Sequence, residues 1–106
     1  MTSDKPTNSM NQTIFVTAEL AMHPDHPRDD VIDAVEQFCR DMESEAGCLQ
    51  ARATYDDNAP HRVILWERYA SRAAIDAHFA MPHTQAFIAS GVTALVQAFE
   101  TMERVS

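Results

Sequence analysis

Glycine and lysine are scarce in this sequence, and their scarcity excludes two common classes of function. Among the 106 residues there are only two glycines, Gly47 and Gly91, so no glycine-rich loop is available to wrap a phosphate group. Eight basic residues, of which only Lys5 is a lysine, stand against 16 acidic ones and give a formal net charge of -8. Nucleic acids and anionic membrane surfaces bind to clustered positive charge, so neither is expected as a partner.

Long apolar runs and cysteine motifs are missing as well. No stretch approaches the roughly 20 apolar residues that a membrane span needs. Residues 1–12 lack the apolar middle of a signal peptide, so we expect a flexible tail there and a single domain over residues 13–106. Cys39 and Cys48 form neither a CxxC pair nor a disulfide framework, which favours two inert core thiols and a cytoplasmic location.

Hydrophobic patterns divide the remaining sequence into strands and helices. Residues 14–20 are rich in β-branched and aromatic side chains and predict a buried strand. Residues 48–55 and 62–69 alternate between the two faces and predict half-buried strands. In the first of these, the apolar side carries Leu49, Ala51, Ala53 and Tyr55. Apolar residues recur at helical spacing over residues 31–42, and we expect Gly47 to end this helix as a left-handed cap.

A second helix is expected after the third strand, and it is interrupted. Ser71 is a candidate N-cap, and Pro82 divides the helical pattern into two segments. The second segment keeps a helical spacing from Thr84 to about Ala98, with Gly91 in its apolar stripe, which leaves residues 99–105 as a weak final strand. The order β-α-β-β-α-β predicts an α+β, ferredoxin-like fold with helices on one face of an antiparallel sheet.

The opposite face of this sheet would carry Trp66 and would have no helix to cover it. A second copy of the chain can provide the cover, because two such sheets can pack face to face. We therefore expect a homodimer that forms through the sheets.

Two histidines, His78 and His83, lie five residues apart on either side of a Met-Pro break. The helical pattern directs His78 towards the seam between helix and sheet, either as a core-edge imidazole or as a proton carrier in a pocket. No Cys, Asp or Glu evidently converges on the pair, so no metal site is expected. For the same reason His23 and His26 are expected to lie in a solvated loop.

Glu67 and Tyr69 share the apolar face of the third predicted strand. A carboxylate on such a face costs on the order of several kcal/mol unless it is paired or protonated. Glu67 is therefore expected to accept a hydrogen bond from Arg52, Tyr69 or His78, or to act as an acid or base with a raised pKa.

The segment over residues 47–87 also carries a resemblance. In order, it contains Gly47-Cys48-Leu49 at the start of a strand, Glu67-Arg68-Tyr69, a short helix ending in His78, and Pro82-His83 followed by Phe87. Together these motifs resemble the antibiotic biosynthesis monooxygenase superfamily, which includes the quinol monooxygenases. The resemblance extends over roughly residues 13–105, and members of that family have a ferredoxin-like fold and form dimers through their sheets.

The resemblance implies a monooxygenase that uses O₂ without a flavin, metal or other cofactor. A phenolic or quinol substrate is deprotonated in an apolar pocket, and its electron-rich anion reduces O₂ directly to give a quinone. The catalytic residues would be His78 as base or hydrogen-bond partner, Tyr69 orienting the ring, and Glu67 setting the tautomer of a histidine. The substrate-binding residues implied are Trp66, His83, Phe87 and Phe15.

Two other functions remain open beside this one. One branch of the family isomerises a phosphorylated autoinducer sugar and shares the Glu-x-Tyr and Pro-His pattern, although no arginine spacing here argues for a phosphate site. A non-catalytic dimeric module could also bind a small molecule in the same pocket, because a fold does not fix a function. Haem-degrading relatives use an Asn on the first strand, where this chain has Thr17 and Glu19, so haem degradation is disfavoured.

Overall fold

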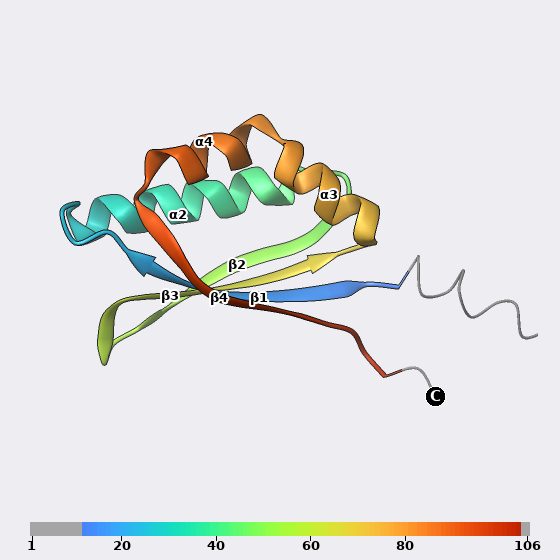
Figure 1. Ribbon diagram of the computed structural model, residues 1–106, viewed down its shortest axis with the longest axis horizontal. Helices are drawn as coiled ribbons and strands as arrows, with labels where there is room; N and C mark the ends of the chain where they lie inside the picture. Colours follow the sequence, from blue (N-terminus) through green and yellow to red (C-terminus); the bar gives the residue numbers. More distant parts are fainter. Residues whose placement is uncertain (1–11, 105–106) are drawn as a thin grey trace, which may run out of the picture.

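The computed structural model describes residues 12–104, which fold into one layer of helices on one sheet (Figure 1). The elements of this part of the chain are β1 (Ile14–Met22), α2 (Arg28–Glu43), β2 (Cys48–Asp56), β3 (Ala59–Tyr69), α3 (Arg72–Ala80), α4 (Pro82–Ser90) and β4 (Thr93–Thr101). The strands form an antiparallel sheet in the order β2-β3-β1-β4, which confirms the predicted ferredoxin-like fold. Most of the expected tail, residues 1–11, lies outside the described residues.

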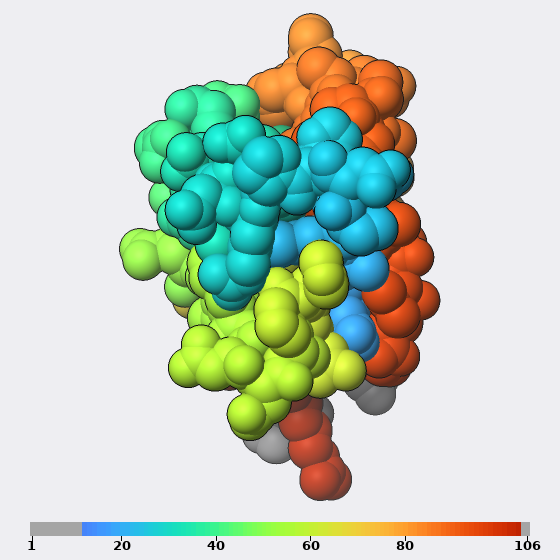
Figure 2. All heavy atoms as spheres, turned by 90° about the vertical axis from the view of Figure 1, so that its left-hand side faces the viewer, coloured from blue at the N-terminus to red at the C-terminus, as the bar shows by residue number. Residues whose placement is uncertain are grey.

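The core lies between the helical layer and the sheet. Figure 2 looks at the end of the molecule that carries the β2–β3 turn, and it shows helical residues above the strands and β4 along one edge. The predicted alternation of β3 is confirmed, because every second residue on one side is buried: Val63, Leu65, Glu67 and Tyr69. Leu49 was predicted on the buried side of β2 but is 53% exposed, because the register of the strand shifts between Cys48 and Gln50.

The end of the chain differs from the prediction. The helix that was expected to reach Ala98 ends at Ser90, because Gly91 adopts the left-handed conformation with φ 68°. A full strand, Thr93–Thr101, then pairs with β1 where a helical segment and a weak strand were expected. A bulge leaves Val96 without a partner in this pairing, so apolar residues appear on both faces of β4 and imitate a helical spacing.

Helices α3 and α4 meet at one extended residue, Met81, which ends the first helix and begins the second. Pro82 occupies the first turn of α4, where its missing N–H is harmless, and it keeps the preceding residue out of the helical region. The predicted break is therefore confirmed, as is the cap at Ser71, whose Oγ accepts the Ala74 N–H at 3.2 Å. None of the helices in residues 12–104 is long and apolar enough to cross a membrane.

Gly47 is required for a different reason from the one expected. Helix α2 is capped by Ser44 in the right-handed region, and Gly91 is the one glycine of the described chain with a positive φ. Gly47 instead lies against α3, where a Cβ built on it would be 2.4 Å from the Cβ of Ala74. Its carbonyl oxygen also accepts the Ala70 N–H at 2.9 Å. The close approach of two backbones, and not a left-handed turn, therefore requires glycine here.

The face of the sheet that carries no helix is open in the single chain. Thr17 of β1 is paired with Trp66 of β3 on one side and with Phe99 of β4 on the other, so the three side chains form a row across the sheet. Trp66 is 48% exposed and Phe99 is 55% exposed. A row of aromatic residues exposed to this degree is typical of an interaction surface.

Candidate functional site

A cavity of about 210 Å³ lies between the sheet and the helices. Its lining is mainly aliphatic and aromatic, and the polar side chains that reach it are Glu67, Tyr69, His78, Thr84 and Glu100. An apolar protein cavity of about 150 Å³ is large enough to bind benzene. The space in this chain is therefore large enough for a substituted aromatic ring.

The break between α3 and α4 brings the residues of the cavity wall together. His78 lies in the last turn of α3 and Thr84 in the first turn of α4, and Thr84 Oγ1 is 3.3 Å from His78 Nδ1. One turn further along α4, Phe87 lines the cavity and stacks on Phe38 of α2 with ring centroids 4.2 Å apart. His78 is buried, with 6% of its side chain exposed, which confirms its predicted position at the seam between helix and sheet.

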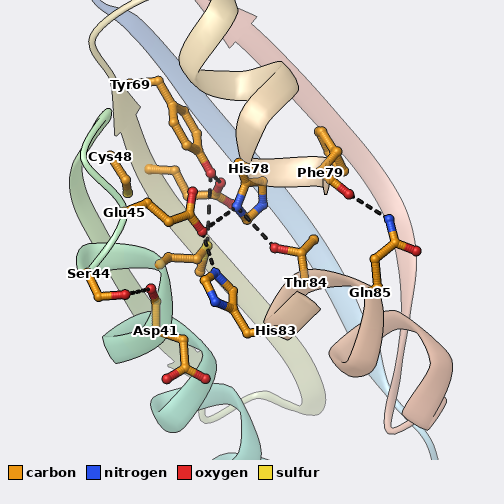
Figure 3. Close-up of polar contacts among 12 residues, drawn as sticks. Asp41, Ser44, Glu45, Cys48, Tyr69, His78, Phe79, His83, Thr84 and Gln85 are labelled. Atoms are coloured by element: carbon orange, nitrogen blue, oxygen red, sulfur yellow. Dashed lines mark hydrogen bonds and ion pairs between the residues drawn. The ribbon is translucent and has the colours of Figure 1, made fainter. Parts of the chain in front are cut away.

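Glu45 joins the two histidines, as Figure 3 shows. Its Oε2 lies 3.0 Å from His78 Nδ1 and 2.5 Å from His83 Nε2, and its side chain is only 4% exposed. We call Glu45, His78 and His83 the Glu45 cluster. The expectation that no carboxylate converges on the histidines is therefore wrong. Glu45 belongs to the turn after α2, so nothing in the helical pattern around either histidine indicated the contact.

The Glu45 cluster also fixes which nitrogen of His78 carries its proton. A carboxylate can only accept, so Nδ1 of a neutral His78 donates its hydrogen to Glu45. The other nitrogen, Nε2, then holds a lone pair, and no residue in the described part of the chain forms a hydrogen bond with it. The tautomer is set by Glu45, and not by Glu67 as the resemblance implied. An imidazole held in this way can accept a proton from a molecule in the cavity.

Glu67 and Tyr69 form a second buried polar pair on the sheet side of the cavity. The Tyr69 hydroxyl donates a short hydrogen bond to Glu67 Oε1. Tyr69 is one of the three hydrogen-bond donors that the sequence suggested for Glu67. Arg52, another candidate, instead lies 3.5 Å from Glu43. Burial raises the pKa of Glu67, although the bond from Tyr69 opposes the shift. Burial and the Glu67 carboxylate raise the pKa of Tyr69, which therefore keeps its proton and remains a hydrogen-bond donor.

Two of the implied substrate-binding residues lie on the wrong side of the sheet for this cavity. Trp66 follows Leu65 on β3 and so points to the open face, where its indole N–H donates to Thr54 Oγ1 at 2.9 Å. Phe15 lies on the same face, with the Arg68 guanidinium 5.1 Å from its ring centroid. Because side chains alternate between the two faces of a strand, Trp66 and Phe15 point away from the cavity. They therefore cannot bind a substrate that lies in it.

The other implied residues are placed as follows. His78, Tyr69, Glu67 and Phe87 all line the cavity. His83 does not line it but binds Glu45 from the solvent side, with 23% of its side chain exposed. Sequence reasoning missed Glu45, and it also missed part of the apolar lining, Phe38, Phe79, Leu95 and Ala98.

Both cysteines are buried free thiols, in agreement with the prediction of inert core residues. Burial raises the pKa of Cys39 to about 12 and that of Cys48 to about 11, and neighbouring carboxylates add to both shifts. Because the thiolate is the reactive form, neither side chain is available as a nucleophile at neutral pH.

Several solved structures share this fold. A protein from Chloroflexus aurantiacus J-10-fl, named as a candidate antibiotic biosynthesis monooxygenase, is 23% identical, with 89% of this chain and 95% of that one covered and a TM-score of 0.72. A protein with a similar name from Deinococcus radiodurans is 20% identical, with 88% and 96% covered and a TM-score of 0.73. PA3566 from Pseudomonas aeruginosa is 19% identical, with 91% and 98% covered and a TM-score of 0.77. At these identities the similarity establishes the fold alone.

Family membership comes from the sequence. No curated protein matches the chain. The profile of the antibiotic biosynthesis monooxygenase family matches residues 13–90, a segment that runs from β1 to the end of α4 and stops just before β4. The chain therefore belongs to the antibiotic biosynthesis monooxygenase family.

Proposed function

We propose that the protein is a monooxygenase that oxidises a small phenolic or quinol-type aromatic compound with O₂ and without a cofactor. The observation that carries the proposal is an apolar cavity of about 210 Å³ whose wall contains His78, held by Glu45 with its Nε2 free. The cavity suits one substituted aromatic ring, and the free nitrogen suits the acidic hydroxyl of a phenol.

The reaction begins with transfer of the phenolic proton to His78 Nε2. Glu45 stabilises the resulting imidazolium through the bond to Nδ1, which has a length of 3.0 Å. The phenolate, held against an apolar lining, is electron-rich enough to reduce O₂ directly. In a phenol, one atom of O₂ replaces the hydrogen on the ring carbon para to the hydroxyl and becomes the second carbonyl oxygen of the quinone. The other atom leaves as water with the hydrogens of that C–H and of the phenolic O–H. A quinol already has both of these oxygens and instead gains the new oxygen as a ring hydroxyl. The Tyr69 hydroxyl, on the sheet side, provides a hydrogen-bonding group for a second oxygen of the substrate.

Isomerisation of a phosphorylated sugar fits the cavity less well. A phosphate site needs arginine, lysine or a cluster of backbone N–H groups. The charged residues that line the cavity are Glu67 and Glu100, both acidic, together with His78. Arg72, the arginine nearest in the chain to His78, is paired with Glu100. The carboxylates of Glu67 and Glu100 would therefore repel a dianionic phosphate in the cavity.

Oxygen uptake with a panel of substituted naphthols and dihydroxynaphthalenes tests the proposed function. We expect uptake above the spontaneous rate and, with ¹⁸O₂, one labelled atom in the quinone. Ala98→Phe should lower the excess rate by at least about tenfold, because Ala98 lines the cavity from β4 and a ring there fills the space that the substrate needs. Ala77→Phe, at an exposed position of α3 outside the lining, is the matched control.

Each outcome of this experiment points to one function. Uptake that is equal in the wild type and in Ala98→Phe over the whole panel would overturn the proposal. A quinol that raises the melting temperature without any excess uptake would indicate the non-catalytic binding module. Turnover that depends on a phosphate group of the substrate would indicate the isomerase.

We also infer that the protein acts as a homodimer through the open face of its sheet, with the row of Thr17, Trp66 and Phe99 at the interface. Phe99→Asp should convert a dimer into a monomer in light scattering, because it places an unpaired charge in an apolar interface. Ile88→Asp, at an exposed residue of the helical layer, should leave the mass unchanged. A wild-type mass of one chain at micromolar concentration would contradict the inference.

A further inference from the structure

The Glu45 cluster has the composition of a divalent metal site. It offers one carboxylate oxygen and two imidazole nitrogens, all within 4.8 Å of one another. Two neutral imidazoles and a carboxylate are a ligand set that Zn²⁺ and neighbouring first-row metals accept in proteins. We propose that Glu45, His78 and His83 together bind one divalent transition-metal ion. The sequence argument against a metal was the lack of a convergent carboxylate, and Glu45 supplies it.

The separations between the donor atoms are close to those that such an ion needs. Metal–ligand bonds of about 2.0–2.1 Å at tetrahedral angles place neighbouring donor atoms about 3.3 Å apart. The Glu45 oxygen lies 3.0 Å from His78 Nδ1 and 2.5 Å from His83 Nε2. The two imidazole nitrogens lie within 4.8 Å of each other. An ion would replace the two hydrogen bonds, and the necessary change in any donor separation is at most about 1.5 Å.

Burial and charge also favour a cation at this place. The exposed fraction of the side chain falls from 23% at His83 to 6% at His78 and 4% at Glu45, so the site is enclosed but has an entrance beside His83. A buried carboxylate with two imidazole partners is stabilised more strongly by a dication than by neutral hydrogen-bond donors. The chain as a whole carries a net charge of -8, which attracts cations. Thr84 Oγ1 lies 3.3 Å from His78 Nδ1 and is a further oxygen close to the cluster.

Metal binding and proton transfer at His78 exclude each other, a consequence that rests on the proposed function. A metal ion on Nδ1 takes the position that the proton occupies when Nδ1 donates to Glu45. A neutral imidazole then carries its proton on Nε2, which becomes a donor and can no longer accept a proton from the substrate. The metal is therefore an inhibitor of the enzyme and not its cofactor.

Titration of the untagged, EDTA-treated full chain with Co²⁺ tests the site directly. We expect the visible absorption of four-coordinate Co²⁺ to saturate at one ion per chain, and one equivalent of Zn²⁺ to displace it. His83→Gln should weaken binding by at least about 100-fold, because it removes a direct ligand. His26→Gln and His61→Gln, both at exposed positions, are matched controls that should bind as the wild type does.

A second variant keeps the test decisive if loss of an imidazole disturbs the fold. His83→Cys retains a ligand, so it should still bind Co²⁺ and add a thiolate-to-cobalt charge-transfer band in the near ultraviolet. Absence of that band, or absence of saturable absorption in the wild type, would overturn the proposal. So would binding that survives in His83→Gln but is lost in His26→Gln, because the ion would then lie in the loop that contains His23 and His26.

The inhibitory role has its own readout. Zn²⁺ should lower the excess oxygen uptake of the wild type in proportion to the occupancy measured with Co²⁺, and His83→Gln should lose this sensitivity relative to its own metal-free rate. Full activity of the Zn²⁺-saturated wild type would overturn the inhibitory role. If no substrate is ever turned over, the binding titration still decides whether the site exists, so the two proposals fail separately.

Discussion

Replacement of His78 by asparagine is expected to lower the excess rate of quinol oxidation by about 10²–10⁴-fold, the range that a positioned general base contributes. The amide N–H₂ of asparagine can take the place of Nδ1–H as the donor to Glu45, so the hydrogen bond of 3.0 Å has a substitute. The variant lacks any counterpart of Nε2, however, and the phenolic proton has no acceptor. We therefore expect loss of activity with little loss of stability.

Oxygen uptake and thermal unfolding of this variant should be measured together. His61→Asn is the matched control, because His61 is exposed on β3 and lies outside the cavity lining. The control should retain both the rate and the melting temperature. Wild-type turnover in a folded His78→Asn variant would remove the base from the proposed mechanism, and the Glu67–Tyr69 pair would be the next acid–base candidate.

Gly47→Ala is expected to cause a large loss of stability for the addition of a single methyl group. The new Cβ would lie 2.4 Å from the Cβ and 3.3 Å from the Cα of Ala74, so a strand terminus and α3 must separate. Overpacking of this kind costs about 1–3 kcal/mol and sometimes more. For a domain of this size each kcal/mol lowers the melting temperature by about 4–8 °C.

A double-mutant cycle separates the steric contact from other effects. Ala74→Gly alone should cost about 1 kcal/mol of helix stability. Combined with Gly47→Ala it should recover most of the loss, because it removes the Cβ that the new methyl group meets. Gly91→Ala is the control for backbone strain: it has a positive φ and no atom within 4 Å, so its cost should not respond to Ala74→Gly. Additive losses for Gly47→Ala and Ala74→Gly would contradict this explanation.

The sequence predicted β3 and α2 well because each has one clearly buried face. The alternation of Val63, Leu65, Glu67 and Tyr69 is an example, since the structure buries all of them. β4 could not be predicted in the same way. It is an edge strand with exposed residues on both faces and a bulge at Val96, so its apolar residues do not alternate. The glycine that separates it from α4 was assigned to a helical stripe, because spacing does not reveal a positive φ.

In the candidate site, too, the sequence predicted what depends on local spacing and missed a contact between distant residues. His78 was predicted to lie at the seam because its position depends on the period of its own helix. Glu45 was missed because its contact with His78 joins residues 33 positions apart and depends on the way in which α3 packs against the turn after α2. Gly47 explains that packing, since it allows α3 to approach closely, but its role was assigned to a helix cap.

The protonated state of Cys39 and Cys48 has a consequence for the durability of the protein. In the proposed reaction an organic anion reduces O₂ by one-electron steps, and any superoxide or hydrogen peroxide that escaped would be released beside the hydrophobic core. Oxidation to sulfenic acid requires an accessible thiolate, and burial holds the pKa values of these thiols at about 12 and about 11. Repeated turnover should therefore leave both sulfur atoms in the reduced form.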